Sequence, residues 1–372
     1  MPSSTSSSKR LTAADRPGIA QPVPERDIPH RPWPRMLLAA LLFATALTGA
    51  WEWYWRDFGA VPGYRDDDAL WARQRRRIDA GEGDATVLLG ASRTFFDIQL
   101  PVWQQLSGRR PIQLGLDGTS PLFALEDLAQ DPAFHGRLIV GIAPDIFFTG
   151  FEYKGTAGPY WRKESPSQRV GKWLSMQLVE PYFAFYDPDF ALFTVLRRQP
   201  WPQRPGQRGG TAVRKLSITE ADRNNYMWRK LETDRDYGDL ARSIWAEDFH
   251  PPPPTPKERA ENQRILEEQI SRTAAAIAQL RARGVPVLFV RDPSAGEYLA
   301  FENRNFPRAD TWEPLLMRAG APGIHFEDYP ELRTGYELPE WSHMTRKSAE
   351  RYTAELYRMI EREHALPGGQ RW

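Results

Sequence analysis

The chain has 372 residues, which is enough for one large hydrophobic core or two modest ones. Its formal net charge of +1 gives no sign of a nucleic-acid-binding surface, and the absence of cysteine excludes thiol catalysis, thiolate zinc sites and disulfide bonds. No spacing of His, Asp and Glu suggests a metal site, and no glycine-rich phosphate loop of the P-loop or dinucleotide type is present, so we expect neither a metal nor a cofactor.

The N-terminal part of the chain predicts a tail followed by a membrane anchor. Residues 1–35 are rich in Ser, Pro and Arg and lack apolar periodicity, which predicts a disordered tail. Residues 36–56 are mostly apolar and end in a Trp and Tyr cluster that extends the run as an interfacial belt. We expect an uncleaved transmembrane helix; a buried core helix and a cleaved signal peptide are the alternatives. By the positive-inside rule the tail is then cytoplasmic, and residues 60–372 lie outside the cytoplasmic membrane.

Short apolar strands alternate with helical stretches on both sides of one long irregular region. The expected strands are residues 85–90, 111–116, 137–142, 285–290 and 324–326, and the expected helices are residues 67–80, 97–107, 121–130, 255–283 and 345–363. A capping box of Thr255 and Glu258, with Pro256 at the first helical position, marks one helix start. The alternation is typical of parallel βαβ units, so residues 60–372 are predicted to form an α/β domain with a doubly wound sheet.

The irregular region, about residues 145–254, is rich in Trp, Tyr, Phe, Pro and Arg. We interpret it as one large insertion on the functional edge of the sheet rather than as a separate domain. Its apolar segments 183–186 and 190–196 could form a lid or a membrane-facing flap. The plainer interpretation, that these aromatic side chains pack the insertion's own core, is the one we favour.

Residues able to do chemistry follow the strands of the predicted sheet. Ser92 follows the first strand, Gly118 follows the second, and Glu340 and His343 lie between the last strand and the last helix. A Ser hydroxyl is a poor nucleophile until a base removes its proton, and a His can be that base when a carboxylate holds its tautomer. An acid three residues before a His is by itself more often a surface salt bridge. Here, however, all these positions fall at one edge of the sheet and can converge.

The order of these short blocks resembles that of the SGNH (GDSL-like) hydrolases, a flavodoxin-like, three-layer α/β family of esterases and acyltransferases. Residues 90–93 (Gly-Ala-Ser-Arg) match the nucleophile block, residues 113–119 resemble the block with the oxyanion-hole Gly, and residues 340–343 match the acid-x-x-His block, with Glu where Asp is usual. The third block normally carries an Asn, which residues 141–145 lack. Losing one oxyanion donor costs about 2.7–4 kcal/mol in the transition state.

The resemblance implies a role for each matching residue. Ser92 would be the nucleophile, His343 would act first as base and then as acid, and Glu340 would orient His343. The backbone N–H groups of Ser92 and Gly118 would hold the oxyanion. The α/β-hydrolase elbow is a poorer match, because it needs Gly two residues after the Ser and Thr94 stands there.

A membrane anchor joined to such a domain resembles the bacterial alginate O-acetyltransferases and the D-alanine transfer protein of teichoic acid modification. The resemblance implies a single-pass protein of the bacterial inner membrane with a periplasmic catalytic domain. It would move or remove acyl groups, with acetyl expected, on a cell-surface polysaccharide, beside a membrane-bound O-acyltransferase. A catalytically silent SGNH-like scaffold in a polysaccharide synthesis or export complex is the alternative, and a cleaved-signal esterase is a third possibility.

Two arginines could belong to the same pocket. Arg93 follows Ser92 directly and could bind an anionic polymer or pair with an acid. Arg291 follows the strand at 285–290, so it lies at the same edge of the sheet and could line the pocket.

Overall fold

The computed structural model describes residues 31–199, 201, 214–366 and 371–372, so most of the predicted tail lies outside the described residues. The chain divides into two compact units, Met1–Trp51 and Glu52–Trp372.

The apolar run forms one long helix, α1 (Trp33–Phe58), which begins and ends slightly outside the predicted range of 36–56. It is the one helix in the described part of the chain that is long and apolar enough to cross a membrane, and its apolar window is not buried. By length and composition it could be a membrane anchor or a signal sequence. Its last residues, 52–58, belong to the second unit.

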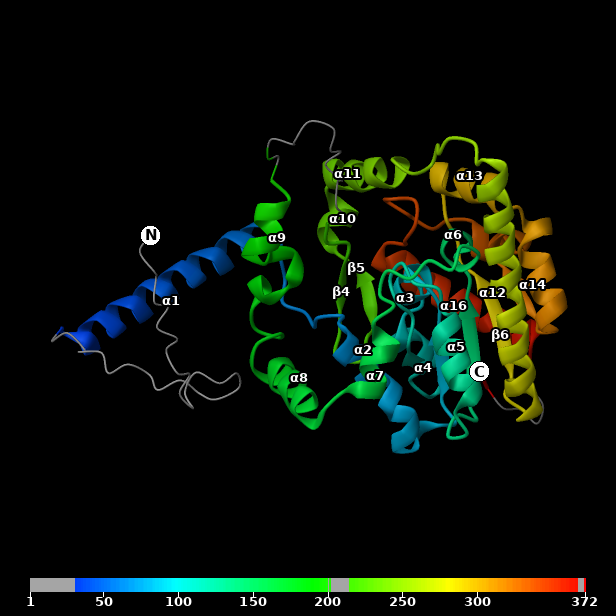
Figure 1. The fold of residues 1–372 in the computed structure, drawn as a ribbon, viewed down its shortest axis with the longest axis horizontal. Helices are drawn as coiled ribbons and strands as arrows, with labels where there is room; N and C mark the ends of the chain where they lie inside the picture. The colour runs from blue at the N-terminus through cyan, green and yellow to red at the C-terminus, as the bar shows by residue number, and fades with distance from the viewer. Residues whose placement is uncertain (1–30, 200, 202–213, 367–370) are drawn as a thin grey trace, which may run out of the picture. The chain divides into compact units, whose positions relative to one another are not determined.

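The second unit is built on a parallel sheet of five strands in the order β2-β1-β3-β6-β7. Figure 1 shows β6, one of these strands, among the surrounding helices. The strands are β1 (Thr86–Leu89), β2 (Ile112–Gln113), β3 (Arg137–Gly141), β6 (Val287–Arg291) and β7 (Gly323–His325). All five predicted strands are present and parallel, although β2 is shorter than predicted. The α/β prediction is confirmed at this level.

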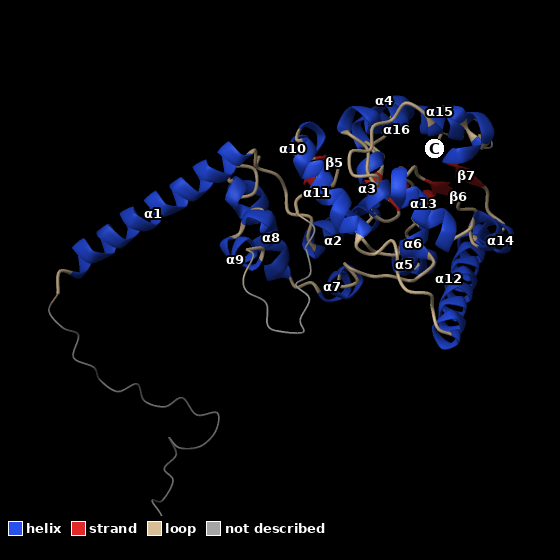
Figure 2. Ribbon diagram, turned by 90° about the horizontal axis from the view of Figure 1, so that it is seen from above, coloured by secondary structure: helices blue, strands red, loops and turns tan. Residues whose placement is uncertain are grey.

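Helices bury both faces of the sheet, as parallel sheets require. Alternate residues of β1 point to opposite faces: Val87 and Leu89 pack in one hydrophobic cluster and Leu88 packs in the other. The first cluster includes residues of α2 (Asp68–Arg77), α5 (Leu122–Gln130), α12 (Pro256–Ala282) and α14 (Trp312–Ala319). The second includes residues of α4 (Leu100–Ser107), α15 (Pro330–Arg333) and α16 (Arg346–Glu363). Figure 2 shows α4, α15 and α16 on one side of the strands and α5 and α12 on the other.

Two helix starts predicted from the sequence can be compared with the structure. The capping box of α12 is confirmed, since the Thr255 side chain accepts from the Glu258 N–H and the Glu258 side chain accepts from the Thr255 N–H. The helix predicted over 97–107 is present as α4, which ends before Gly108 as expected but begins only at Leu100. Two helices occur, α3 (Ser92–Asp97) and α4, because Ile98 and Gln99 have extended backbone angles.

The segment between β3 and α12 forms short helices and a two-stranded antiparallel sheet. These elements are α6 (Pro144–Phe147), α7 (Ala157–Lys163), α8 (Pro166–Leu178), α9 (Leu192–Arg197), β4 (Ser217–Thr219), β5 (Asn225–Met227), α10 (Arg229–Thr233) and α11 (Arg235–Ala246). Phe190, Trp228 and Tyr237 pack in a small core of their own, as the favoured interpretation expects. Other aromatic side chains of the segment, Tyr182, Phe183 and Phe193 among them, are exposed. Helix α13 (Gly296–Asn305) follows β6.

Candidate active site

Ser92 is the first residue of α3, directly after the turn that ends β1. A Cβ on Gly90 or on Gly141 would collide with the side chain of Thr94, so Thr94 can occupy its position only next to two glycines. The Thr94 hydroxyl donates to Asp292 Oδ2 at 2.9 Å, at the end of β6. Thr94, two residues after Ser92, therefore packs against the end of β3 and is hydrogen-bonded to the residue after β6.

Glu340 and His343 form a buried pair in the loop before α16. Glu340 Oε1 lies 2.9 Å from His343 Nδ1 and accepts the His343 backbone N–H at 2.6 Å. Trp341, between them, has a φ of 69°, and this left-handed residue turns the chain so that the carboxylate faces the ring. The Ala295 N–H donates to the Trp341 carbonyl at 2.8 Å and holds the turn in place. The predicted pair is thus an internal contact and not a surface salt bridge.

The second oxygen of Glu340 is bound by a residue that sequence reasoning missed. Trp245 of α11 donates from Nε1 to Glu340 Oε2 at 2.7 Å. Burial on its own would raise the pKa of Glu340, but the charge of His343 and the hydrogen bonds from His343 and Trp245 outweigh it, so the pKa is lowered. Glu340 is therefore held as a carboxylate that accepts from three N–H groups when His343 carries its proton on Nδ1.

The other side of the His343 ring faces α3. Phe96, one helical turn after Ser92, stacks on the imidazole with ring centres 4.1 Å apart. His343 Nε2 is buried and makes no hydrogen bond to any described residue, so it is not bonded to the Ser92 hydroxyl in this structure. Catalytic hydrogen bonds are often long in free enzymes and tighten only with substrate. The unpaired Nε2 is the atom that a general base would use.

Ser92 and His343 line one cleft of about 1070 Å³. Its walls come from the sheet edge, including Phe96 and Gly118, and from the segment between β3 and α12, including Trp245. Gly118 has a φ of 53°, a conformation that favours glycine. The structure thus brings Ser92, Gly118 and His343 to a single cleft, with Glu340 behind His343.

The two predicted pocket arginines converge on one buried acid. Arg93 donates to Glu302 Oε1 and Arg291 donates to Glu302 Oε2, both at 2.7 Å, and all three side chains are at most 3% exposed. Burial would raise the pKa of Glu302, but the charges of Arg291 and Arg93 outweigh it and lower the pKa. Arg93 lines the cleft and Arg291 is not among the lining residues. The sequence left two interpretations of Arg93 open, and in the structure Arg93 is paired with an acid.

The position of the third block holds Asp145 in α6. Tyr298, which lines the cleft, donates from its hydroxyl to Asp145 Oδ2 at 2.6 Å. Burial, together with the nearby charge of Glu302, raises the pKa of Asp145. Asparagine is absent from the described residues that line the cleft, and the side-chain amide of Gln199, which does line it, donates to the Val195 carbonyl at 3.0 Å.

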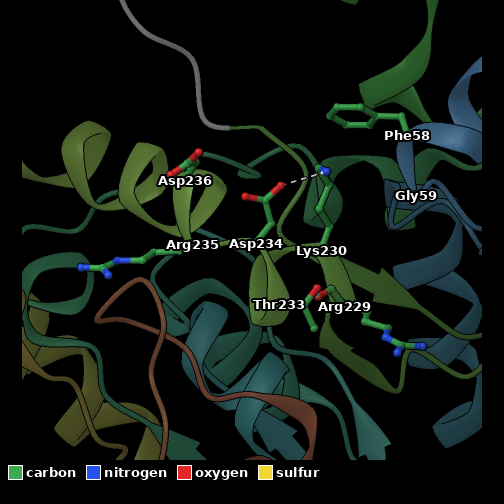
Figure 3. Close-up of a pocket in the computed structure, with 8 residues that line it drawn as sticks. All are labelled: Phe58, Gly59, Arg229, Lys230, Thr233, Asp234, Arg235 and Asp236. Atoms are coloured by element: carbon green, nitrogen blue, oxygen red, sulfur yellow. Dashed lines mark hydrogen bonds and ion pairs between the residues drawn. The ribbon is translucent and has the colours of Figure 1, made fainter.

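A second hollow lies on the surface and lacks the chemistry of the cleft (Figure 3). Its volume is about 600 Å³, and its charged lining residues include Lys230 and Asp234, which form an ion pair at 3.0 Å within one helical turn. Neither Ser92 nor His343 lines it. Among the described residues, no group of three His, Asp or Glu side chains could hold a metal ion.

Neither a comparison with protein-family models nor one with curated proteins gave a match for this chain.

Proposed function

We propose that this protein is a membrane-anchored, extracytoplasmic serine esterase or O-acyltransferase of the SGNH type. It would move or remove acyl groups, with acetyl expected, on a cell-surface polysaccharide. The observation that carries the proposal is the buried Glu340–His343 pair, whose unpaired Nε2 belongs to a residue that shares a cleft with Ser92.

The fold supports the proposal. Counted along the sheet in chain order, the five parallel strands have the order 2-1-3-4-5, which is that of flavodoxin-like folds. Ligands of such sheets bind beyond the carboxyl ends of the strands, where Ser92 and Gly118 lie. This strand order fits the SGNH resemblance. Many unrelated proteins share it, so the proposed function must be argued from the residues of the site.

The proposed reaction uses Ser92, Gly118 and His343 of the cleft, together with Glu340 behind His343. His343 Nε2 takes the proton of Ser92, whose Oγ attacks the acyl carbonyl, while Glu340 holds the Nδ1–H and stabilises the imidazolium. The N–H of Ser92, in the first turn of α3, has no partner within the helix and can hold the oxyanion together with the N–H of Gly118. His343 then protonates the leaving group. A sugar hydroxyl or water next attacks the Ser92 ester, with His343 again as base.

An uncleaved α1 is the form that we propose, and its last turns pack within the second unit. Trp55 contacts Phe190 and Phe58 contacts Trp228, so this end of the helix belongs to the small core of the segment between β3 and α12. We therefore propose a single-pass protein of the bacterial inner membrane, with a cytoplasmic N-terminus and a periplasmic catalytic domain. A membrane-bound O-acyltransferase is the proposed partner that delivers the acyl group.

The second candidate is the catalytically silent scaffold. The lack of an asparagine in the described lining of the cleft and the absence of a Ser92–His343 hydrogen bond favour it. It predicts the same fold with no activated serine.

A fluorophosphonate probe, which labels only activated serines, separates the two candidates. We expect the full chain in detergent to be labelled at Ser92, and the rate to fall by about 10⁴-fold or more in Ser92→Ala and His343→Ala, since a triad works as a unit. Ser342→Ala is the matched control, because Ser342 lines the same cleft without a role in the proposed reaction. Absence of labelling in the folded wild-type chain would reject the esterase and favour the scaffold.

Trp245 is expected to act as a positioning residue through Glu340. Replacing it by Phe keeps an aromatic ring but removes the hydrogen bond to Oε2, and a bond to a charged group contributes about 1.5–3 kcal/mol. We expect kcat for an activated acetyl ester to fall about 10- to 100-fold. The pKa of Glu340 should rise, so that activity is lost at a higher pH on acidification. Trp201→Phe, at an exposed tryptophan that does not line the cleft, should change neither quantity; an unshifted pH profile in Trp245→Phe would contradict the role.

A further inference from the structure

The segment between β3 and α12 carries a set of large apolar side chains on its surface. We call these six residues, which are between 42% and 71% exposed, the α8–α9 face: Trp173, Leu178, Tyr182, Phe183, Leu192 and Phe193. Figures 1 and 2 show α8 and α9 at the same end of the second unit. Contiguous exposed apolar surface on a folded domain marks a binding surface for protein or membrane.

Within residues 166–199, the exposed charges are all of one sign, although Asp57 in the neighbouring last turn of α1 is an exposed acid. Between residues 166 and 199 the acids are Glu180, Asp187 and Asp189, and none of them is exposed. Each is neutralised by a cation: Glu180 by Lys172, Asp187 by Lys215 and Asp189 by Arg198. The exposed charges of the same stretch are the basic Arg169, which pairs with the buried Glu164 at 3.2 Å, and Arg197. The face is therefore apolar and basic without an exposed carboxylate.

The face adjoins the last turns of α1. Glu52 accepts the backbone N–H groups of Ala184 at 3.0 Å and Phe185 at 2.9 Å, and Arg56 donates to the Tyr182 carbonyl at 2.8 Å. Glu52 is the first residue after the apolar run, and Trp53 and Tyr54 beside it are 70% and 55% exposed. Exposed aromatic residues from two parts of the chain thus gather at the point where the chain leaves the apolar run.

We propose that the α8–α9 face lies in the headgroup region of the lipid bilayer that α1 enters, as a second membrane contact that does not span it. This inference rests on the proposed anchoring by α1. Tryptophan and tyrosine favour the membrane–water interface, and basic residues without competing acids are attracted to anionic lipids. An anionic lipid surface repels exposed carboxylates, which fits the absence of exposed acids in residues 166–199. Binding to a partner protein would not need this absence.

The proposal places the candidate active site at the membrane surface. Thr194 and Arg197 of α9 line the cleft that contains Ser92, while Leu192 and Phe193 of the same helix belong to the α8–α9 face. The cleft therefore opens beside the lipid, within reach of an acyl donor or a polymer held at the membrane. This arrangement favours a substrate presented at the bilayer over one that diffuses freely in solution.

Single-cysteine labelling tests the proposal cleanly, because the chain contains no cysteine. The full chain is reconstituted in vesicles of phosphatidylethanolamine and phosphatidylglycerol, with an environment-sensitive fluorophore on Leu178→Cys or Phe193→Cys. Ala44→Cys, in the middle of α1, reports whether the helix is inserted. Met317→Cys on α14, at a residue 77% exposed, reports the aqueous environment. Nitroxide lipids with shallow or deep labels and aqueous iodide serve as quenchers.

We expect the labels at 178 and 193 to be quenched by shallow nitroxide lipids about twofold or more above the Met317→Cys label, and to be shielded from iodide. Quenching by iodide at both positions, with the Ala44→Cys label deep in lipid, would overturn the membrane contact and leave the anchor standing. Shielding from iodide without lipid quenching, accompanied by energy transfer between labelled copies, would assign the face to a second copy and also overturn it. An Ala44→Cys label outside the bilayer would overturn the anchor, and shallow quenching at 178 and 193 would then still support the contact.

Discussion

Glu340→Gln is expected to lower kcat for an activated acetyl ester by about 10⁴-fold while the chain remains folded. The carboxylate faces three N–H groups, from His343 Nδ1, the His343 backbone and Trp245 Nε1. A glutamine has one carbonyl oxygen and one NH₂ group, so one of its contacts must become a donor facing a donor. His343 can relieve this conflict by moving its proton to Nε2, the tautomer that cannot act as base toward Ser92.

The matched control for this variant is Glu337→Gln. Glu337 lies in the same loop, is exposed, and is not among the residues that line the cleft. We expect wild-type kcat from Glu337→Gln and an unchanged circular dichroism spectrum from both variants. A decrease of less than about tenfold in Glu340→Gln would mean that Glu340 does not orient a catalytic histidine, because the loss of that role in a serine triad is far larger.

Glu302→Gln is expected to destabilise the second unit by about 3–5 kcal/mol, the usual cost of removing one partner of a buried ion pair. Glu302 is 1% exposed, and its two oxygens bind Arg93 and Arg291, which are themselves buried. The variant keeps the size of the side chain but removes the one carboxylate that both buried guanidinium groups contact. Because burial disfavours an uncompensated charge, the substitution raises the free energy of the folded state.

Urea unfolding of the purified chain, followed by tryptophan fluorescence, measures this effect. Glu297→Gln is the control on the same helix, since Glu297 is exposed, and we expect it to change the free energy of unfolding by less than about 0.5 kcal/mol. A similarly small change in Glu302→Gln would show that the two arginines are compensated in another way. The assignment of Arg93 to a structural ion pair would then fail, and its alternative role in binding an anionic polymer would regain support.

Local patterns account for the parts of the structure that the sequence predicted. Five short apolar runs became the five strands, because a strand buried on both faces needs an unbroken apolar stretch. The capping box of α12 involves side chains three residues apart. Glu340 and His343 meet for the same reason, since a turn in one loop is enough to bring residues at that spacing together.

The errors arose where the backbone departs from regular geometry. The helix predicted from residue 97 begins only at Leu100, because Ile98 and Gln99 are extended and separate it from the short helix α3; tertiary hydrogen bonds hold the chain between the two helices. The Gln99 N–H donates to the Thr353 hydroxyl and the Leu100 N–H donates to the Asn224 side chain, at 2.8 Å each. Neither partner is near in sequence, so helical propensity could not reveal the break.

The sequence by itself determined the strands, the long apolar helix and the Glu340–His343 pair, because each depends on residues within a few positions of one another. Only the tertiary structure decided which side chains complete the site. Trp245 lies 95 positions from Glu340, and Arg93 lies 209 positions from Glu302. Such contacts form only when the strands and the segment between β3 and α12 are packed together, and many arrangements of the same elements would leave these side chains apart. The physical reason is that short-range patterns reflect local backbone preferences, whereas residues far apart in the sequence come into contact only when the whole chain folds.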